Sequence, residues 1–111
     1  MSEDLLDRIN HFGIENQKRK FGEEADELKE AIFAHELKLS VQYEIPLTEI
    51  IGTRQHIAEE IVDNLALLRQ FQLYYEITDE EIYHIFVEKN ERTKKRIEEK
   101  YYEKNKNTIC E

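Results

Sequence analysis

Glycine and proline are scarce in this chain, and that scarcity limits what it can fold into. Only three glycines and one proline occur among 111 residues, whereas turns and sheets normally use more of both. The length suits one small domain with one hydrophobic core, and we place this domain over residues 1–111. We therefore expect an all-α fold, with a polar tail at about 101–111 that frays.

The balance of charges narrows the classes of partner. Sixteen basic against 25 acidic residues give a net charge of −9, which argues against nonspecific binding to nucleic acid or to an anionic membrane. The one cysteine, Cys110, cannot form an intramolecular disulfide or a thiolate zinc cluster. No long apolar run follows the acidic Glu3 and Asp4, so we expect neither a signal peptide nor a transmembrane span. These observations favour a cytoplasmic protein.

Apolar residues that recur every three or four positions predict helices in four stretches: about Glu3–His11, Ile14–Leu37, Thr53–Tyr75 and Thr78–Lys100. Gly13 separates the first two helices, and the third could begin earlier, at Pro46–Glu49. The apolar residues of the third helix follow one face: Ile57, Ile61, Leu65 and Leu68, with Gln72 in line. A second apolar side of this helix carries Leu67, Phe71 and Tyr74, and it predicts a homodimer or homotetramer.

Two local patterns stand out between and within these helices. Leu39–Leu47 alternates apolar and polar residues as a strand would, but no second strand is predicted to pair with it, so we expect a packed loop. A capping box opens the fourth helix, with Thr78 as the N-cap and Glu81 at position N3. Ile77 and Ile82 flank this box and fit a hydrophobic staple.

Two pairs of acids suggest the chemistry. Glu24 and Glu27 on the second predicted helix, like Glu60 and Asp63 on the third, are spaced i,i+3 and so lie on one side of their helix. Both pairs lie at the margin of an apolar stripe, so antiparallel packing would bring four carboxylates together. Such acids need a raised pKa or a counter-charge, and all-oxygen ligands favour Mg²⁺ or Mn²⁺. With 25 acids in the chain, a solvated acidic face is the alternative for either pair alone.

An ordered set of motifs surrounds these acids. Its members are Gly13-Ile14-Glu15-Asn16-Gln17, Glu23-Glu24-x-x-Glu27, Glu60-x-x-Asp63 within Ile61-Val62-Asp63-Asn64-Leu65, and Lys89-x-x-Arg92. Together, over about residues 12–100, they resemble the signature of the MazG-like superfamily of all-α nucleoside triphosphate pyrophosphohydrolases, in particular its small phage-type members. The interval between Glu27 and Glu60 is longer than in compact members of that superfamily.

The resemblance implies a fold, a reaction and a set of site residues. It implies a four-helix MazG-like bundle completed by homo-oligomerisation, which hydrolyses an NTP or dNTP to the monophosphate and pyrophosphate. Mg²⁺, or Mn²⁺, would be held by Glu24, Glu27, Glu60 and Asp63, and Glu23 is the candidate to accept a proton from the attacking water. The candidate substrate-binding residues are Lys89, Arg92, Asn64, Gln17 and Lys20. A solvated basic face is the alternative for Lys89 and Arg92, and a core amide is the alternative for Asn64.

Other functions share parts of this pattern. A phosphoribosyl-ATP pyrophosphohydrolase, or an enzyme specific for dUTP or dCTP, would use the same kind of acids. A di-iron carboxylate bundle needs two Glu-x-x-His motifs, and the sequence offers only Glu81-x-x-His84. The alternative from another class is a non-catalytic helical interaction protein with an acidic surface.

Overall fold

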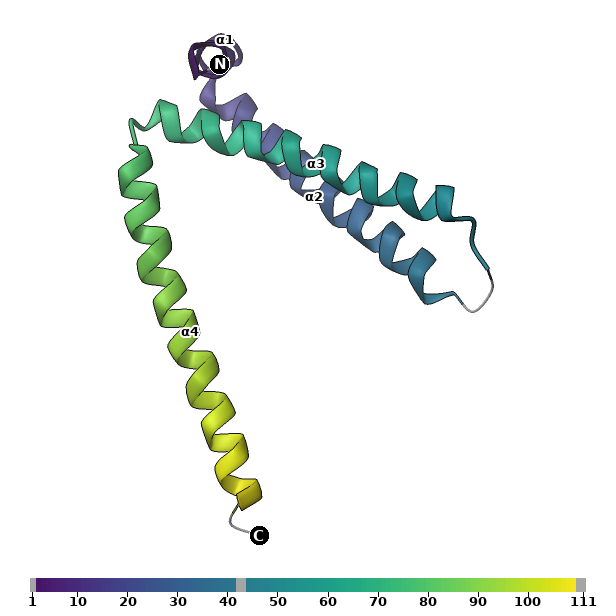
Figure 1. Cartoon of the computed structure of the whole chain (residues 1–111). Helices are drawn as coiled ribbons and strands as arrows, with labels where there is room; N and C mark the ends of the chain where they lie inside the picture. Colours follow the sequence, from purple (N-terminus) through teal and green to yellow (C-terminus); the bar gives the residue numbers. More distant parts are fainter. Residues whose placement is uncertain (1, 42–43, 110–111) are drawn as a thin grey trace. The chain divides into compact units, whose positions relative to one another are not determined.

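The computed structural model describes residues 2–41 and 44–109, which hold four helices and no strand. The helices are α1 (Ser2–Phe12), α2 (Ile14–Ser40), α3 (Leu47–Tyr74) and α4 (Asp79–Ile109), as drawn in Figure 1. The prediction of an all-α fold is therefore confirmed. The chain divides into two compact units, Met1–Glu76 and Ile77–Glu111. Within the described ranges, none of the helices is long and apolar enough to span a bilayer.

Gly13 separates α1 from α2, as the sequence predicts. Its backbone has φ 87° and ψ 147°, a conformation that residues with a side chain rarely adopt. The Gly13 amide donates to the carbonyl of Ile9 at 2.9 Å, and the Gln17 amide donates to the carbonyl of Gly13 at 3.1 Å. One helix thus ends and the next begins at this residue, and the reversal lets α1 pack against both α2 and α3.

The first unit is built on an antiparallel pair of helices, α2 and α3. Contacts across the pair run in opposite directions along the two chains: Gln17 with Gln70, Glu24 with Asn64, His35 with Thr53 and Lys38 with Glu49. The inward positions on α2 recur at alternating spacings of four and three: Gln17, Phe21, Glu24, Leu28, Ala31, His35 and Lys38. Those on α3 recur in the same way: Ile50, Thr53, Ile57, Glu60, Asn64, Leu67 and Phe71. This is the spacing of a coiled-coil seam, but the middle of the seam is polar.

The buried side of α3 differs from the prediction. Ile61, Leu65 and Leu68 were expected on the packing face, yet they are 43%, 57% and 48% exposed. The buried positions of α3 are instead Glu60, Asn64, Leu67 and Gln70. Apolar residues occur on more than one side of α3, and the contacts with α1 and α2 decide which side is covered. The side with Ile61 is thus one that α1 and α2 leave uncovered.

The connection between α2 and α3 is shorter than predicted. Helix α2 continues to Ser40 and α3 begins at Leu47, so the packed loop expected over Leu39–Leu47 was wrong at both ends. Residues 42–43 of that stretch lie outside the described part of the chain. The Lys38 ammonium and the Glu49 carboxylate form an ion pair of 3.2 Å across the connection. The alternation of apolar and polar residues was misleading, because helix ends hold three residues of that stretch.

The second unit consists of α4. Its N-terminus has the predicted capping box: the Thr78 amide donates to Oε2 of Glu81 at 2.8 Å, and the Glu81 amide donates to Oγ1 of Thr78 at 3.1 Å. The helix runs to Ile109, so the predicted end near Lys100 was too early. A lone helix has no second element in its own unit against which to bury a stripe, and Ile82, Ile85 and Phe86 are exposed.

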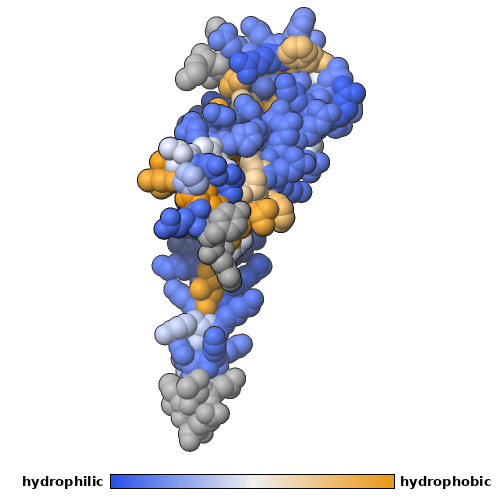
Figure 2. Space-filling view, turned by 90° about the vertical axis from the view of Figure 1, so that its right-hand side faces the viewer, coloured by the Kyte–Doolittle hydropathy of each residue, from blue (hydrophilic) through white to orange (hydrophobic). Residues whose placement is uncertain are grey.

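Exposed apolar side chains occur in both units. Phe33 on α2, Leu65 on α3 and Phe86 on α4 are more than half exposed. In Figure 2 apolar patches interrupt a predominantly hydrophilic surface. Patches of this kind mark surfaces that bind partners.

Candidate metal centre

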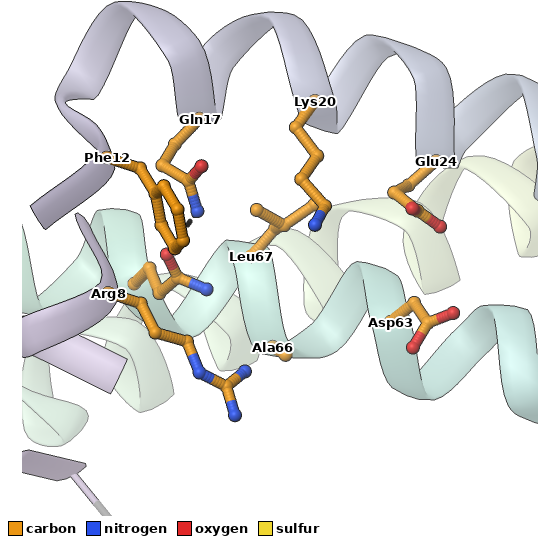
Figure 3. Close-up of a pocket in the computed structure, with 9 residues that line it drawn as sticks. Arg8, Phe12, Gln17, Lys20, Glu24, Asp63, Ala66 and Leu67 are labelled. Carbon is orange, nitrogen blue, oxygen red and sulfur yellow. Dashed lines mark hydrogen bonds between the residues drawn. The ribbon is translucent and has the colours of Figure 1, made fainter. Parts of the chain in front are cut away.

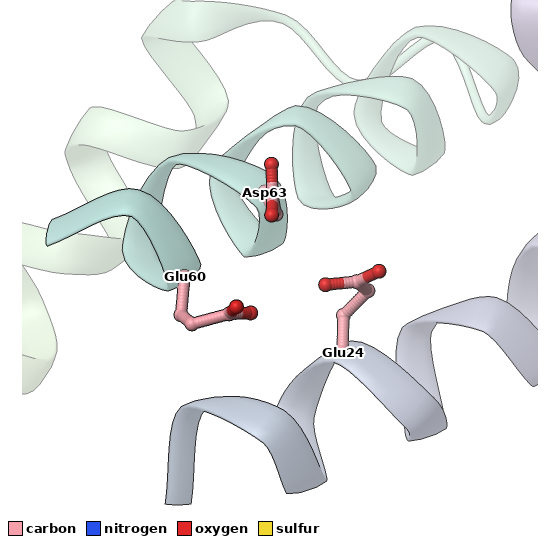
Figure 4. A group of neighbouring side chains, drawn as sticks. All are labelled: Glu24, Glu60 and Asp63. Carbon is pink, nitrogen blue, oxygen red and sulfur yellow. The ribbon is translucent and has the colours of Figure 1, made fainter. Parts of the chain in front are cut away.

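Three carboxylates meet in the middle of the α2–α3 seam. Glu24 comes from α2, and Glu60 and Asp63 come from α3, one turn apart. One oxygen of each carboxylate lies within 4.8 Å of one oxygen of the others, and Figure 4 shows the carboxyl groups of Glu24 and Glu60 turned toward each other. The antiparallel packing thus brings together three of the four acids that the sequence predicts as metal ligands.

Two oxygens of this cluster are buried without a donor. Glu60 is only 8% exposed and Glu24 is half-buried, whereas Asp63 is exposed. Oε2 of Glu24 and Oε2 of Glu60 are inaccessible to solvent and accept no hydrogen bond from any described residue. A buried carboxylate oxygen without a donor is costly unless a cation or a proton compensates for its charge. A cluster of three carboxylates, in which two buried oxygens lack a hydrogen-bond donor among the described residues, fits a hard divalent cation such as Mg²⁺ or Mn²⁺.

The acidity of Glu24 reflects the same crowding. Burial raises the pKa of Glu24 above its ordinary value of 4.5, and the carboxyls of Glu27, Asp63 and Glu60 raise the pKa further. Glu27, the fourth predicted ligand, is exposed and lies outside the group of three, but it is close enough to Glu24 to affect its protonation. Without a cation, Glu24 therefore retains its proton to a higher pH than an isolated glutamate would.

Asn64 links the two helices beside the carboxylate cluster. Its side-chain amide donates to the backbone carbonyl of Glu24 at 3.1 Å and to that of Glu60 at 2.8 Å. The side-chain nitrogen of Asn64 thus acts as a core amide, and the contact of Asn64 with a substrate stays a prediction. By holding both backbones, Asn64 fixes the separation of the two acids.

His56 lies beside the cluster without a hydrogen bond to it. Its Nε2 is 3.8 Å from Oε1 of Glu60, and its Nδ1 is 3.8 Å from Oε2 of Glu59. Both separations are too long for hydrogen bonds. The imidazole is more than half exposed, and it lies next to the Glu60 carboxylate without donating a hydrogen bond to it.

A cavity of about 370 Å³ opens beside the carboxylates. Glu24 and Asp63 line one end, Lys20 reaches in from α2 near the middle, and Phe12 and Gln17 lie at the other end (Figure 3). The remaining lining residues are Arg8, Ala66, Leu67 and Gln70. The volume is in the range of small-molecule sites, which are typically about 300 to 1,000 Å³. Gln17 and Lys20, both predicted from the sequence, thus share one cavity with two of the acids.

Gln17 and Gln70 form a buried pair at the far end of this cavity. Nε2 of Gln17 donates to Oε1 of Gln70 at 2.7 Å, and the two residues are 5% and 2% exposed. Within the described part of the chain, Oε1 of Gln17 and Nε2 of Gln70 have no hydrogen-bond partner. An amide carries acceptor and donor groups, so one of each remains for a ligand.

The remaining predicted site residues are Glu23, Lys89 and Arg92. Glu23 is exposed and lines a neighbouring hollow with Gln17 and Lys20, on the adjacent side of α2. Lys89 and Arg92 belong to α4 in the second unit, where the Arg92 guanidinium is 4.0 Å from the Glu88 carboxylate. The role of Lys89 and Arg92 at the carboxylates stays a prediction.

The sequence patterns do not identify Arg8, Phe12 and Gln70 as residues of the cavity. Arg8 and Phe12 come from α1, and no local pattern indicates that α1 closes the cavity. Gln70 follows Asp63 by seven residues and therefore lies on the same side of α3, a spacing that could have identified it.

Comparison with known proteins adds no relative: no family model, curated protein or solved structure matches this chain.

Proposed function

We propose that this protein is a Mg²⁺-dependent nucleoside triphosphate pyrophosphohydrolase, which cleaves an NTP or dNTP into the monophosphate and pyrophosphate. One observation carries the proposal: Glu24 and Glu60 each keep a buried oxygen without a donor, next to Asp63. That arrangement favours a divalent cation, and the adjoining cavity has the size of a small-molecule site. The reaction class comes from the resemblance of the acid motifs to those of the MazG-like superfamily.

Each site residue of the first unit has a separate role in the proposed reaction. Glu24, Glu60 and Asp63 hold the cation, and Glu27 is available at the edge of the cluster. When bound, Mg²⁺ supplies charge that offsets phosphate oxygens and acidifies a coordinated water. Asn64 keeps Glu24 and Glu60 at a fixed separation through their backbones. Glu23 is the proposed acceptor of a proton from the attacking water.

The proposal includes a bundle completed by homo-oligomerisation into a dimer or tetramer. The exposed apolar side chains of α2, α3 and α4 support it, because a second copy of the chain would cover them. Lys89 and Arg92 are proposed as further phosphate contacts, contributed by the same chain or by a partner subunit. The proposed site of action is the cytoplasm, and the proposed housecleaning of the nucleotide pool would take place there.

An assay of pyrophosphate release tests the proposal. Purified protein is incubated with each common NTP and dNTP, and with phosphoribosyl-ATP, in Mg²⁺ or Mn²⁺, and the products are identified by chromatography. We expect metal-dependent release of pyrophosphate and monophosphate, which Asp63→Asn and Glu60→Gln lower by about a hundredfold or more. The matched control is Glu59→Gln, an exposed acid next to Glu60 that should leave turnover unchanged.

Two results would contradict the proposal. One is turnover that survives both Asp63→Asn and Glu60→Gln, which would place the chemistry elsewhere. The other is no release from any substrate by a folded protein, which would favour the non-catalytic interaction protein. Release from phosphoribosyl-ATP alone would keep the metal centre and the reaction class and change the substrate.

A further inference from the structure

Two cations line the cavity without a carboxylate partner. Arg8 comes from α1 and Lys20 from α2, and both line the same cavity as Glu24 and Asp63 (Figure 3). Among the described residues, neither Arg8 nor Lys20 forms a hydrogen bond or an ion pair. On the outer surface of α2, by contrast, Lys18 pairs with Glu15 at 2.9 Å and Lys29 with Asp26 at 3.8 Å.

The position of these cations indicates the charge of the ligand. Two acids of the carboxylate cluster, Glu24 and Asp63, line one end of the cavity, where the cluster attracts a divalent cation, and Arg8 and Lys20 beside them attract an anion. A ligand that satisfies both must carry oxyanions that bind a metal and extend past it, as linked phosphates do. A guanidinium donates two parallel hydrogen bonds to a phosphate, and an ammonium adds a mobile point charge.

The far end of the cavity offers a place for an aromatic group. Phe12, the last residue of α1, is 54% exposed although it is large and apolar. Its ring meets His11 edge-on at a centroid separation of 4.8 Å. Beside it, the Gln17–Gln70 pair leaves one acceptor and one donor free among the described residues. A stacking surface next to a donor and an acceptor suits a nucleobase.

We propose that α1 forms a nucleotide-binding wall, in which Arg8 with Lys20 binds the phosphates and Phe12 stacks on the base. This inference rests on the proposed function, and it adds residues that neither the acid motifs nor the Lys89 and Arg92 prediction supplies. It gives α1 a part in substrate binding in addition to its packing against α2 and α3. The first unit would then contain both the metal centre and contacts for phosphates and base.

Binding measured apart from turnover tests the inference. The probes are inorganic pyrophosphate and the α,β-methylene analogues of ATP, GTP, CTP and UTP, titrated with Mg²⁺ in a calorimeter. Arg8→Gln and Lys20→Gln should each weaken both kinds of probe by about tenfold to a hundredfold, the loss expected for a charge-assisted hydrogen bond. Phe12→Leu should weaken only the nucleotide analogues, by about fivefold or more. Arg54→Gln and Lys29→Gln remove exposed cations outside this cavity and should change neither.

The outcomes separate this inference from the proposed function. If the wild-type protein binds the analogues and all variants bind equally well, the wall does not bind the nucleotide, while the proposed function stands. Equal weakening of pyrophosphate and nucleotide by Phe12→Leu would overturn the assignment of the base to Phe12. If the wild-type protein binds Mg²⁺ but neither probe and releases no pyrophosphate, the inference and the proposed function fail together.

Discussion

Replacing Glu60 by glutamine should reverse the order of stability between mutant and wild type when Mg²⁺ is added. At a separation of 4.8 Å and an effective dielectric constant of about 20, two full charges repel by about 3.5 kcal/mol. Glu60 takes part in two such pairs, one with Glu24 and one with Asp63. The net gain on removing its charge is smaller, about 1 to 2 kcal/mol, because Asp63 is exposed and solvent screens its charge.

The same substitution removes the advantage that a cation confers. At a Mg²⁺ concentration one hundred times the Kd, a ligand that binds only the folded state stabilises it by about 2.7 kcal/mol. In EDTA we therefore expect Glu60→Gln to be more stable than the wild type, and in saturating Mg²⁺ to be less stable. The order reverses because the Glu60 carboxylate destabilises the fold when no cation is bound and is needed to bind the cation when Mg²⁺ is present.

Urea denaturation followed by circular dichroism measures both conditions. Glu59→Gln is the matched control, since Glu59 is exposed and adjacent, and its substitution should change the free energy of unfolding by less than about 0.5 kcal/mol. The reasoning would be refuted if Glu60→Gln were less stable than the wild type in EDTA. Equal stabilisation of both proteins by Mg²⁺ would also refute it.

Three further predictions concern local features of the fold. In EDTA, the free energy of unfolding should fall as pH rises above 4.5, because Glu24 has a higher pKa in the folded state than in the unfolded state and so binds its proton more tightly when folded. Denaturation of Glu24→Gln at several pH values should show a weaker dependence on pH, and an equal dependence would contradict this prediction. Gly13→Ala should lower the thermal midpoint, because its backbone conformation costs a residue with a side chain about 1 to 2 kcal/mol. Gly52→Ala lies within α3 with open space at its Cβ position, and it should raise stability by about 1 kcal/mol. A change of stability in the same direction for both variants would contradict the account. Thr78→Ala should cost α4 about 1 kcal/mol, seen as lost helical circular dichroism, while Thr78→Ser should retain the cap; equal helicity in the two variants would contradict the capping role.

Local signals in the sequence predicted the helices well. The break at Gly13 and the capping box of Thr78 and Glu81 depend on residues that are neighbours in the chain, so the sequence contains the whole cause. The loop between α2 and α3 was predicted too long, because alternation over nine residues also arises when two helix ends meet a short connection. Local periodicity does not distinguish these cases.

The packing side of α3 could not be predicted from periodicity alone. Hydropathy favours Ile61, Leu65 and Leu68, but α1 and α2 cover the side with Glu60 and Asn64. The amide of Asn64 is stable there because it donates to two backbone carbonyls, and the proposed cation would compensate for the charge of the Glu60 carboxylate. Under the proposed function, the metal centre would be the reason why polar residues replace the hydrophobic pattern at this point.

The candidate site was predictable where helical spacing determines it. Glu60 and Asp63 share a side of α3 by spacing, and antiparallel packing brings Glu24 to them. Arg8 and Phe12 could not be found in this way, because they reach the cavity only through the turn at Gly13 and the packing of α1 on distant residues. Contacts between residues far apart in the sequence leave no local pattern.

The most direct test of the central claim is to locate a bound cation. Substoichiometric Mn²⁺ broadens the NMR signals of nearby amides, and the amides of α2 and α3 can be compared with those of the acidic first turn of α4. We predict selective broadening around Glu24, Glu60 and Asp63 that excess Mg²⁺ reverses and that Glu60→Gln abolishes. Broadening spread over the acidic surface, or unchanged in Glu60→Gln, would contradict a metal centre in the α2–α3 seam.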